Sequence, residues 1–274
     1  MSYLTDLFGV SGKTALVTGG ATGIGRMIAE ALVMTGARVM IASRKGADCE
    51  TVAAELNALD APGTAEGFAG DVGTEAGVDA LSAEVAARTD RLHILVNNAG
   101  VSWGEPFEKF PFSAWQKVMN VNVAGLFTLT RNLVPLLEAA ASDEDPARII
   151  NLGSVMGTKP VADLAYSYAA SKAAVHHLTD IFANDLAARR ITCNAFAPGP
   201  FRSRMTAFVT DDEAKAAFMA KGIPLGRLGE PEDIAAATLY LCGRGGAYVT
   251  GAILPIDGGM KSEAESALFP RDKR

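Results

Sequence analysis

Short, β-branched apolar runs alternate along this sequence with longer segments of helical period. The connections between successive runs are too long for hairpins, so successive strands should lie parallel and be joined by right-handed crossovers. The runs are continuously apolar, which is typical of a sheet covered on both faces. The alternation predicts an α/β fold, a doubly wound parallel sheet of about seven strands with helices on both faces. The expected strands are Thr14–Thr18, Arg38–Ala42, Ala65–Ala69, Ile94–Asn97, Arg148–Leu152, Thr192–Ala197 and Ala252–Ile256. The expected helices are Gly23–Thr35, Asp48–Leu59, Glu75–Thr89, Phe112–Ala140, Ala165–Arg189 and Pro231–Cys242.

The chain is expected to form one domain over residues 1–274, because it has no low-complexity stretch, internal repeat or Pro/Ser-rich linker. Two segments break the alternation. Ala141–Ala147 is acidic and is predicted as a solvated surface loop. Pro198–Pro224 is a long connection with a helical patch at Asp211–Ala220; it is predicted as a substrate lid, with a surface insertion as the alternative. The charged segment Lys261–Arg274 is expected to form a C-terminal tail.

Composition and charge exclude several classes of protein. The fractions of hydrophobic and charged residues, 49% and 20%, are those of an ordinary globular chain. The formal net charge is −6, from 25 basic and 31 acidic residues, with no long run of either sign. We therefore expect neither a nucleic acid nor a membrane surface as a partner. No apolar segment approaches the roughly 20 residues that a membrane-spanning helix needs.

The cysteines indicate a reducing compartment. They are scattered, odd in number and mostly inside apolar runs, which favours reduced thiols over a disulfide framework or a zinc site. The segment Met1–Gly12 has neither the basic start nor the long apolar stretch of a signal peptide. We therefore expect a cytoplasmic protein. The three cysteines are Cys49, Cys193 and Cys242.

The histidines show no metal-ligand pattern, so no metal is expected. His176 and His177 are adjacent on a predicted helix and therefore point in different directions. We expect them to be packing or surface residues. The third histidine is His93.

A glycine-rich turn follows the first predicted strand and leads directly into the first helix. The segment Thr18–Gly25 has the spacing Gly-x-x-x-Gly-x-Gly. Glycines at such a turn let a pyrophosphate approach the helix N-terminus, where free N–H groups and the helix dipole favour anions. A glycine cluster alone can be only a tight turn, but its position between strand and helix favours a nucleotide site.

The end of the second strand distinguishes NAD from NADP. An acidic residue there would bind the ribose 2′-hydroxyl, whereas an arginine accommodates a 2′-phosphate. The sequence has no acid at this point and reads Ser43-Arg44-Lys45. Asp48 falls in the first turn of the next helix, where a carboxylate is explained by capping. The two cations could be a solvated loop pair, but they favour NADP(H) as the cofactor.

Together, three motifs carry a family resemblance. They are the glycine turn Thr18–Gly25, Asn97-Asn98-Ala99-Gly100 after the fourth strand, and Tyr168-x-x-x-Lys172. With these motifs in this order, the sequence resembles the compact branch of the short-chain dehydrogenase/reductase family from about Ser11 to Gly259. The resemblance implies a single NAD(P)-binding Rossmann domain and an NADP-dependent oxidoreductase.

The resemblance also implies where the cofactor binds. Asp71 and Val72 would hold the adenine, although Asp71 could also cap the helix that starts near Thr74. Backbone at Asn98–Gly100 would line the nicotinamide-side ribose, whereas Asn97 would tie neighbouring strands together. The stretch after the sixth strand would hold the carboxamide, through the Phe201 backbone and the Ser203 hydroxyl. The expected cofactor residues are Gly19, Thr22, Gly23, Ile24, Gly25, Ser43, Arg44, Lys45, Asp71, Val72, Asn98, Ala99, Gly100, Tyr168, Lys172, Pro198, Gly199, Phe201 and Ser203.

Tyr168 and Lys172 are the expected proton-transfer pair. Residues four apart lie on one face of a helix. A tyrosine with a pKa near 10 is a poor base at neutral pH, but a neighbouring ammonium favours the phenolate. Such a tyrosine is a proton donor for carbonyl reduction and a base for alcohol oxidation. Tyr166 has Ala170 four residues on, so we expect it to be a packing or pocket residue.

Ser154 and Asn122 complete the expected catalytic residues. Ser154 follows the fifth strand, where its hydroxyl can stabilise charge that develops on a substrate oxygen. Many family members carry a second serine at the position of Gly153, which leaves Ser154 as the candidate here. By resemblance, Asn122 holds a water that links Lys172 to solvent. An asparagine in mid-helix is consistent with a special role.

The implied reaction is hydride transfer between NADP(H) and a carbonyl or secondary alcohol. An apolar pocket with one polarising serine suits a hydrophobic ketone. The stretch Ala195–Thr206 resembles 3-oxoacyl thioester reductases, including those proposed to feed rhamnolipid synthesis. The substrate would then be a small carbonyl compound or alcohol, such as an acyl thioester. The expected pocket residues are Trp103, Met156, Phe201, Met205, Phe208 and Phe218.

Other functions stay open at this point. The substrate could be another secondary alcohol, such as a sugar, polyol or steroid, and the chain could sense NADP without turnover. An epimerase or dehydratase of the longer branch is disfavoured by the glycine spacing and by the lack of a C-terminal substrate domain. The segment Asp257–Gly259 resembles a subunit-contact edge, and Phe112–Ala140 with Ala165–Arg189 would form a second interface. A homotetramer is therefore expected.

Overall fold

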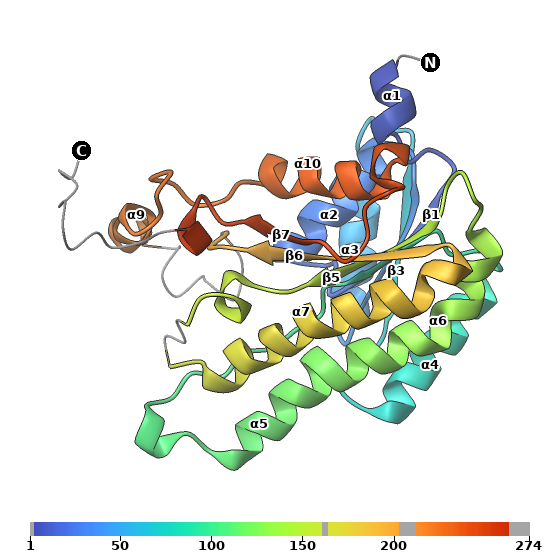
Figure 1. Cartoon of the computed structure of the whole chain (residues 1–274). Helices are drawn as coiled ribbons and strands as arrows, with labels where there is room; N and C mark the ends of the chain where they lie inside the picture. The colour runs from blue at the N-terminus through green and yellow to red at the C-terminus, as the bar shows by residue number, and fades with distance from the viewer. Residues whose placement is uncertain (1–2, 161–163, 203–211, 263–274) are drawn as a thin grey trace.

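The computed structural model describes residues 3–160, 164–202 and 212–262. In this part of the chain, seven parallel strands form one sheet in the order β3-β2-β1-β4-β5-β6-β7 (Figure 1). The predicted doubly wound sheet is confirmed, and each predicted strand end lies within one residue of the observed end. The strands are β1 (Thr14–Thr18), β2 (Arg38–Ser43), β3 (Thr64–Ala69), β4 (Ile94–Asn97), β5 (Ala147–Leu152), β6 (Ile191–Pro198) and β7 (Ile253–Ile256).

Helices cover both faces of the sheet (Figure 1). The first layer contains α2 (Gly23–Met34), α3 (Gly46–Asn57) and α10 (Pro231–Cys242). The second contains α4 (Glu75–Arg88), α6 (Leu126–Ala140) and α7 (Tyr166–Leu186). Alternate strand residues serve the two layers: on β1, Ala15 and Val17 face the first, and Leu16 faces the second. Because side chains alternate along a strand, both halves of the core are built from the same continuously apolar runs.

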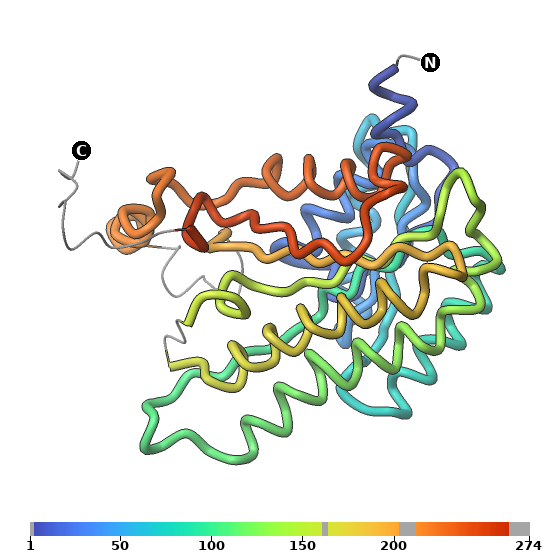
Figure 2. The backbone as a smooth tube through the Cα atoms, in the orientation of Figure 1, coloured from blue at the N-terminus to red at the C-terminus, as the bar shows by residue number. Residues whose placement is uncertain are grey.

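The helix predicted over Phe112–Ala140 consists of three pieces, which Figure 2 shows as one continuous rod. The α-helix α5 (Phe112–Met119) passes into the wider π-turn η2 (Asn120–Gly125) and then into α6. A Cβ at Gly125 would lie 1.9 Å from the Val72 carbonyl oxygen, so this turn touches the loop after β3. π-Turns inside helices often occur at functional sites.

Several shorter elements complete the described chain. The helical patch predicted near Asp211–Ala220 is α9 (Glu213–Lys221). An N-terminal helix, α1 (Tyr3–Phe8), was not predicted; its Asp6 pairs with Arg244 at 3.1 Å. The short 3₁₀ turns are η1 (Phe107–Lys109), η3 (Val155–Gly157), η4 (Ala187–Arg189), η5 (Arg244–Gly246) and η6 (Met260–Ser262).

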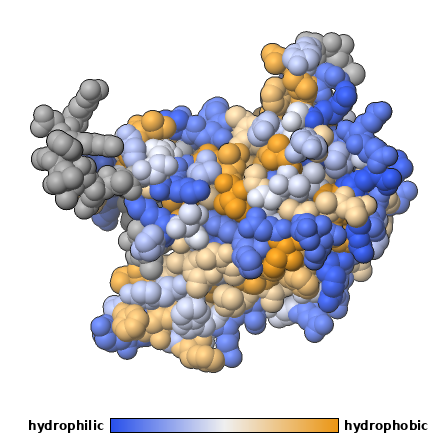
Figure 3. All heavy atoms as spheres, viewed as in Figure 1, coloured by the Kyte–Doolittle hydropathy of each residue, from blue (hydrophilic) through white to orange (hydrophobic). Residues whose placement is uncertain are grey.

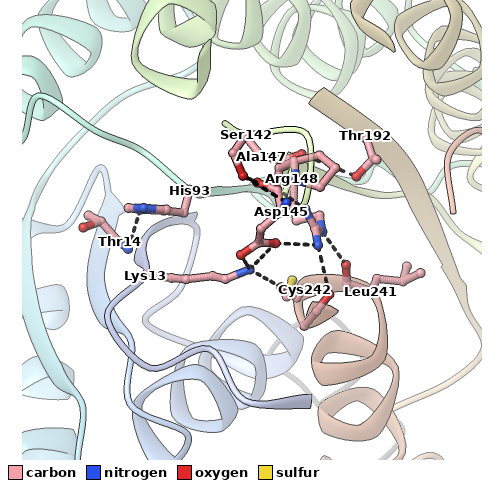
Figure 4. A network of polar contacts seen from close by, with 12 residues as sticks. Lys13, Thr14, His93, Ser142, Asp145, Ala147, Arg148, Thr192, Leu241 and Cys242 are labelled. Atoms are coloured by element: carbon pink, nitrogen blue, oxygen red, sulfur yellow. Dashed lines mark hydrogen bonds and ion pairs between the residues drawn. The ribbon is translucent and has the colours of Figure 1, made fainter. Parts of the chain in front are cut away.

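The segment Ala141–Ala147 is not merely a solvated loop, as was predicted. Its Asp145 Oδ1 accepts hydrogen bonds from Lys13 Nζ and from Arg148 Nη2, each at 2.9 Å (Figure 4). Arg148 is fully buried. The prediction failed because both cations lie at the amino ends of strands, where the loop folds back to meet them.

The two cations also donate hydrogen bonds to the backbone carbonyls at the C-terminal end of α10 (Figure 4). Arg148 Nε donates to the Leu241 carbonyl at 3.0 Å and Nη2 to the Gly243 carbonyl at 2.9 Å, while Lys13 Nζ donates to the Cys242 carbonyl at 3.0 Å. Positive charge is favourable at a helix C-terminus, whose last carbonyls have no partner within the helix. Burial lowers the pKa of Lys13, and the hydrogen bond to Asp145 opposes that shift. This cluster therefore connects β1, β5 and α10 at the edge opposite the strands' carboxyl ends.

Replacing Arg148 with methionine should destabilise the fold strongly. The change leaves the Leu241 and Gly243 carbonyls without their buried donor and leaves Asp145 with Lys13 alone. Breaking a buried ion pair costs about 3–5 kcal/mol. Urea unfolding would measure the loss as a lower midpoint. The matched control is Arg26→Met, which removes an exposed pair with Glu55 and should cost less than about 1 kcal/mol. Equal losses in the two variants would contradict the structural role of the cluster.

Candidate active site

The carboxyl ends of β1 and β4 are joined by a set of hydrogen bonds. The Thr18 hydroxyl donates to the Val96 carbonyl at 3.3 Å and accepts from the backbone N–H groups of Asn98 and Ala99, each at 3.1 Å. The Asn98 side-chain amide donates to the carbonyls of Thr18 at 2.8 Å and Gly19 at 3.1 Å. Two of the predicted motifs thus hold each other in place.

The glycine turn leaves no space for side chains where it passes Asn98. A Cβ on Gly25 would lie 2.3 Å from Asn98 Nδ2 and 2.5 Å from the Gly19 carbonyl oxygen. Gly19 and Gly23 have φ angles of +66° and +54°, which glycine adopts at little cost. Thr22 is the N-cap of α2, and its side chain makes no capping hydrogen bond. The amino end of this helix is therefore suited to an anion.

A cleft with a volume of about 260 Å³ runs past this turn. It brings together nine of the predicted cofactor residues, which come from the ends of β1, β2, β3 and β4: Gly19, Thr22, Ser43, Arg44, Lys45, Asp71, Val72, Ala99 and Gly100. Gly23, Ile24, Gly25 and Asn98 do not line the cleft, but they belong to the turn and its support. The sequence analysis missed eight lining residues, mostly small or apolar, whose types carry no signal: Thr18, Ala21, Ala42, Asp48, Gly70, Leu81, Val101 and Val121.

The end of the cleft beside β2 carries positive charge. Arg44 and Lys45 are exposed and line the cleft, and the Ser43 hydroxyl donates to the Lys45 carbonyl at 3.3 Å. Asp48 lies in the first turn of α3, as predicted, but it also lines the cleft. Two cations and one carboxylate therefore face the same space, which suits a phosphate better than a bare ribose hydroxyl.

Asp71 fixes the loop after β3. Its Oδ1 accepts a hydrogen bond from Gly73 N at 2.9 Å, while Thr74 is the N-cap of α4 and accepts from Gly77 N at 3.1 Å. Asp71 thus shapes the turn before the helix and lines the cleft at the same time. The cap of α4 is thus Thr74 and not Asp71, so the capping interpretation of Asp71 is wrong, and its role at the adenine remains a prediction.

Tyr168 and Lys172 lie together on α7, as their spacing predicts. The Lys172 ammonium nitrogen is 5.4 Å from the centre of the Tyr168 ring and donates to the Leu152 carbonyl at 2.5 Å. Burial lowers the pKa of Lys172 to about 8. A Cβ built on Gly100 would lie 3.6 Å from this nitrogen, so Lys172 stands next to a residue that lines the cleft.

Ser154 is the direct partner of Tyr168. Burial of the phenol raises the pKa of Tyr168, and a side-chain hydrogen bond with Ser154 opposes the rise. The Ser154 hydroxyl also accepts from Met156 N at 3.2 Å, because Ser154 is the N-cap of η3. The serine that follows β5 and the tyrosine on α7 therefore meet, as predicted.

Asn122 occupies the π-turn η2 and is buried. Its Oδ1 accepts from Val101 N at 2.9 Å, and its Nδ2 donates to the Val101 carbonyl at 3.0 Å and to the Ser171 hydroxyl at 2.9 Å. The Ser171 hydroxyl donates in turn to the Tyr168 carbonyl at 2.7 Å. Asn122 thus connects the loop after β4 to the helix that carries Tyr168 and Lys172.

Asn97 connects neighbouring strands, as the sequence analysis expected. Its Nδ2 donates to Asn151 Oδ1 and to the Thr130 hydroxyl, each at 3.0 Å. Asn151 Nδ2 donates onward to the Thr179 hydroxyl at 3.0 Å. This buried polar chain ties β4 and β5 to helices α6 and α7.

Phe201 does not line the nucleotide cleft with its side chain. The residue is 2% exposed and packs in the core. A Cβ at the adjoining Gly229 would lie 2.4 Å from the Phe201 ring. Phe201 faces a second cleft of about 300 Å³ between the end of β7 and the segment before α10. The predicted backbone role of Pro198, Gly199 and Phe201 remains a prediction.

The remaining predicted pocket residues differ in exposure. Trp103 is 39% exposed, and the Lys117 ammonium lies 5.5 Å from the centre of its ring. Phe218 is 78% exposed and packs little against the body of the molecule. Tyr166, predicted as a packing or pocket residue, packs edge-on against Phe107 and Phe110. Ser203, Met205 and Phe208 lie outside the described residues.

One buried residue beside the site was not expected to have a specific role. His176 was predicted to be a packing or surface residue, but its Nε2 accepts a hydrogen bond from Ser154 N at 3.4 Å. Its position four residues after Lys172 is a signal that could have placed it on the same face of α7.

The described residues contain neither a metal-binding cluster nor a membrane-spanning helix. Over residues 3–160, 164–202 and 212–262, no three His, Cys, Asp or Glu side chains gather as a metal-binding group. Within the same ranges, no helix combines the length and apolar character needed to cross a bilayer.

Comparison with known proteins defines the family. The family model described as enoyl-(acyl carrier protein) reductase matches residues 19–261. With this match and the motifs above, the chain belongs to the short-chain dehydrogenase/reductase family and is an oxidoreductase of that family.

The similar proteins include both 3-oxoacyl reductases and sugar-acid dehydrogenases. The chain is 44% identical over 253 residues to a rhamnolipids biosynthesis 3-oxoacyl-[acyl-carrier-protein] reductase of Pseudomonas aeruginosa, covering 92% of this chain and 98% of the relative. It is 38% identical over 263 residues to a 2-dehydro-3-deoxy-D-gluconate 5-dehydrogenase of Bacillus subtilis, covering 96% and 100%. Among solved structures, the NADP active-site complex of RhlG from Pseudomonas aeruginosa superposes with a TM-score of 0.89 at 44% identity, covering 93% and 99%.

Replacing Gly25 with alanine should destabilise the chain, because the new methyl group would force Asn98 or the Gly19 carbonyl to move. Overpacking of this kind costs about 2 kcal/mol, which urea unfolding would measure. Gly104→Ala is the matched control, since a Cβ there meets nothing within 4 Å. The prediction is wrong if both variants unfold at the midpoint of the parent protein.

Proposed function

We propose that this protein uses NADP(H) to transfer hydride to and from a carbonyl group, and that it reduces a 3-oxoacyl thioester or a similar hydrophobic ketone. The observation that carries the proposal is that the nucleotide cleft and the proton-transfer residues are adjacent. Gly100 lines the cleft, and the buried Lys172 ammonium lies next to Gly100. On the same helix, Tyr168 hydrogen-bonds Ser154.

The cofactor assignment rests on the two ends of the cleft. The glycine turn and the uncapped α2 amino end fit a pyrophosphate, and Arg44 and Lys45 fit a 2′-phosphate. Ser43, Asp71 and Val72 would surround the adenosine, and the backbone at Asn98, Ala99 and Gly100 would line the nicotinamide-side ribose. When bound, NADPH would supply the hydride for carbonyl reduction, and a side chain of the protein must supply the proton.

The catalytic residues would divide the proton chemistry. Tyr168 donates its hydroxyl proton to the substrate oxygen as negative charge develops there, and Ser154 donates a second hydrogen bond to the same oxygen. With a pKa of about 8, Lys172 is mostly charged at neutral pH and favours the phenolate that remains. It would also hold the ribose hydroxyls of the cofactor.

Asn122 would position a water that returns a proton to Tyr168 through Lys172. The Asn122 amide donates both Nδ2 hydrogens, one to the Val101 carbonyl and one to the Ser171 hydroxyl. Its Oδ1 accepts a single hydrogen bond, from Val101 N. One lone pair of Oδ1 is therefore left for that water. The backbone at Pro198, Gly199 and Phe201, with the Ser203 hydroxyl, would hold the nicotinamide carboxamide.

The substrate class is supported by apolar residues that follow the strands and by the relatives. Trp103 comes after β4, Met156 lies in η3 after β5, and Leu164 comes shortly before α7. The Pseudomonas relative is named for a 3-oxoacyl substrate. A second candidate is a sugar acid or polyol, which the similarity to the gluconate-type dehydrogenase favours. An NADP sensor without turnover, which the sequence left open, is disfavoured, because the chain belongs to a family of oxidoreductases and a sensor needs no proton donor.

We propose a homotetramer as the assembly. Phe127 on α6 and Ile181 on α7 are 42% and 39% exposed, and Figure 3 shows weakly polar and apolar atoms gathered over α7 on the visible face. β7 ends the sheet order, so its outer edge is available to another copy. The free, buried thiols Cys49, Cys193 and Cys242 support a reducing compartment, which we propose is the cytoplasm.

The proposed activity is tested by NADPH oxidation against a 3-oxoacyl thioester, a simple ketone, a keto sugar acid and a steroid ketone. We expect turnover with the thioester, and we expect Tyr168→Phe to abolish it while NADPH still binds. Preference for the keto sugar acid would favour the second candidate. Tight NADPH binding without any turnover would favour the sensor.

Removing the two cations at the β2 end should change the cofactor preference. In Arg44→Ala/Lys45→Ala, each lost charge-assisted hydrogen bond to the 2′-phosphate is worth about one factor of ten. The KM for NADPH should therefore rise by about a hundredfold, while the KM for NADH stays the same. Arg91→Ala, an exposed cation before β4 at the opposite edge, is the control. An equal rise for NADH would show that the pair does not recognise the 2′-phosphate.

Ser154 should set the pH dependence of alcohol oxidation. Oxidation needs ionised Tyr168, and the hydrogen bond with Ser154 lowers the Tyr168 pKa against the effect of burial. Ser154→Ala removes that opposing effect, so the rate should rise to its plateau only at a higher pH. Ser154→Thr keeps a hydroxyl and should leave the profile in place. A uniform loss of rate in Ser154→Ala, with an unshifted profile, would contradict this role.

A further inference from the structure

His176 stands one helical turn beyond Lys172 and reaches the catalytic serine from behind. The residue is 9% exposed. Its Nε2 lies 3.4 Å from the backbone nitrogen of Ser154, and its Nδ1 lies 3.4 Å from the Thr158 hydroxyl oxygen. The ring therefore contacts the residues on both sides of η3, its N-cap Ser154 and its C-cap Thr158.

The protonation pattern of this ring follows from its partners. The backbone N–H of Ser154 can only donate, so Nε2 must be the unprotonated nitrogen. The proton of the neutral ring is then on Nδ1, where it can be donated to the Thr158 hydroxyl. Thr158 thereby selects the tautomer that accepts from Ser154.

The backbone around the ring is shaped to receive it. A Cβ built on Gly153 would lie 2.1 Å from His176 Nε2, and one built on Gly157 would lie 2.8 Å from His176 Cε1. The imidazole thus fills the space beside position 153, so the serine that many family members carry there would not fit. Gly153, Gly157 and His176 form a matched set.

We propose that His176 is a positioning residue that holds the backbone of Ser154, so that the Ser154 hydroxyl stays directed at Tyr168. This inference rests on the proposed function, in which Ser154 polarises the substrate oxygen. His176 does not touch the reacting atoms. It acts through the Ser154 N–H, which would otherwise be a buried donor without a partner.

The electrostatic surroundings keep the ring neutral. Burial is the main cause that lowers the pKa of His176, and the ammonium groups of Lys172 on α7 and Lys261 on η6 lower it further. Asp180 on α7 opposes them. Ser154 and Thr158, which flank η3 and face the ring, carry no charge. The acceptor at Nε2 is thus present at neutral pH and is lost only on acidification below the usual range of histidine.

The simpler alternative is that His176 only fills space in the core. Two variants separate these roles. His176→Leu fills the space but removes the acceptor, whereas His176→Gln can bring an amide oxygen to the position of Nε2. His177→Leu, at the exposed neighbour, is the matched control.

The test measures kcat, KM and the pH profile of oxidation in the full-length enzyme. For His176→Leu we expect kcat to fall about tenfold, the KM for NADPH to stay the same, and the profile to move to higher pH, as in Ser154→Ala. His176→Gln should recover most of the rate and the original profile. Equal activity in the leucine and glutamine variants, with unshifted profiles, overturns the proposal.

Two further measurements separate failure of this inference from failure of the proposed function. If Ser154→Ala moves the profile and His176→Leu does not, the role of Ser154 stands and that of His176 is wrong. If no substrate turns over, imidazole ¹⁵N chemical shifts in the intact protein still test the contact. We expect an unprotonated Nε2 and a protonated Nδ1 at neutral pH. The opposite tautomer, or a freely titrating ring, overturns the proposal.

Discussion

The arrangement of the whole site depends on the hydrogen bonds between Thr18 and Asn98. They fix the carboxyl end of β1 against that of β4, with the Thr18 hydroxyl between two strands and the Asn98 amide across the glycine turn. On one side, this connection shapes the turn that precedes α2. On the other, it sets the start of the loop that carries Gly100 past Lys172. The nucleotide cleft and the proton-transfer residues are therefore positioned by one short, rigid contact.

Much of the fold and of the site could be predicted because the signals are local. The parallel strands are short apolar runs, and a residue just after such a run must lie at the carboxyl edge of the sheet. Gly19, Asn98 and Ser154 each follow a strand in this way. The spacing of Tyr168 and Lys172 is a helical period, so their proximity also needed no knowledge of the distant chain.

The features that the sequence did not reveal depend on partners far away along the chain. Asp145 is in an acidic segment typical of a solvated loop, but its partner Lys13 lies 132 positions earlier. His176 could be placed on a helix face, yet nothing local indicated that the Ser154 N–H would face it. Phe201 follows a strand, but nothing local indicated that its ring would pack against Gly229, which is 28 positions later.

The π-turn between α5 and α6 also limits how this chain can change in length. A π-turn contains one residue more than an α-helical turn would need, and each residue of an α-helix corresponds to about 100° of rotation. Because the wide turn absorbs that extra residue, deleting one residue from Asn120–Gly125 would restore a regular helix and leave the facing of α6 nearly unchanged. Leu129, Leu133 and Leu137 would stay directed at the core. The deletion would remove the wide turn itself, which holds Asn122 and brings Gly125 against the Val72 carbonyl. A homologous sequence shorter by one residue here should therefore keep the fold and lose the contact between the loop after β4 and α7.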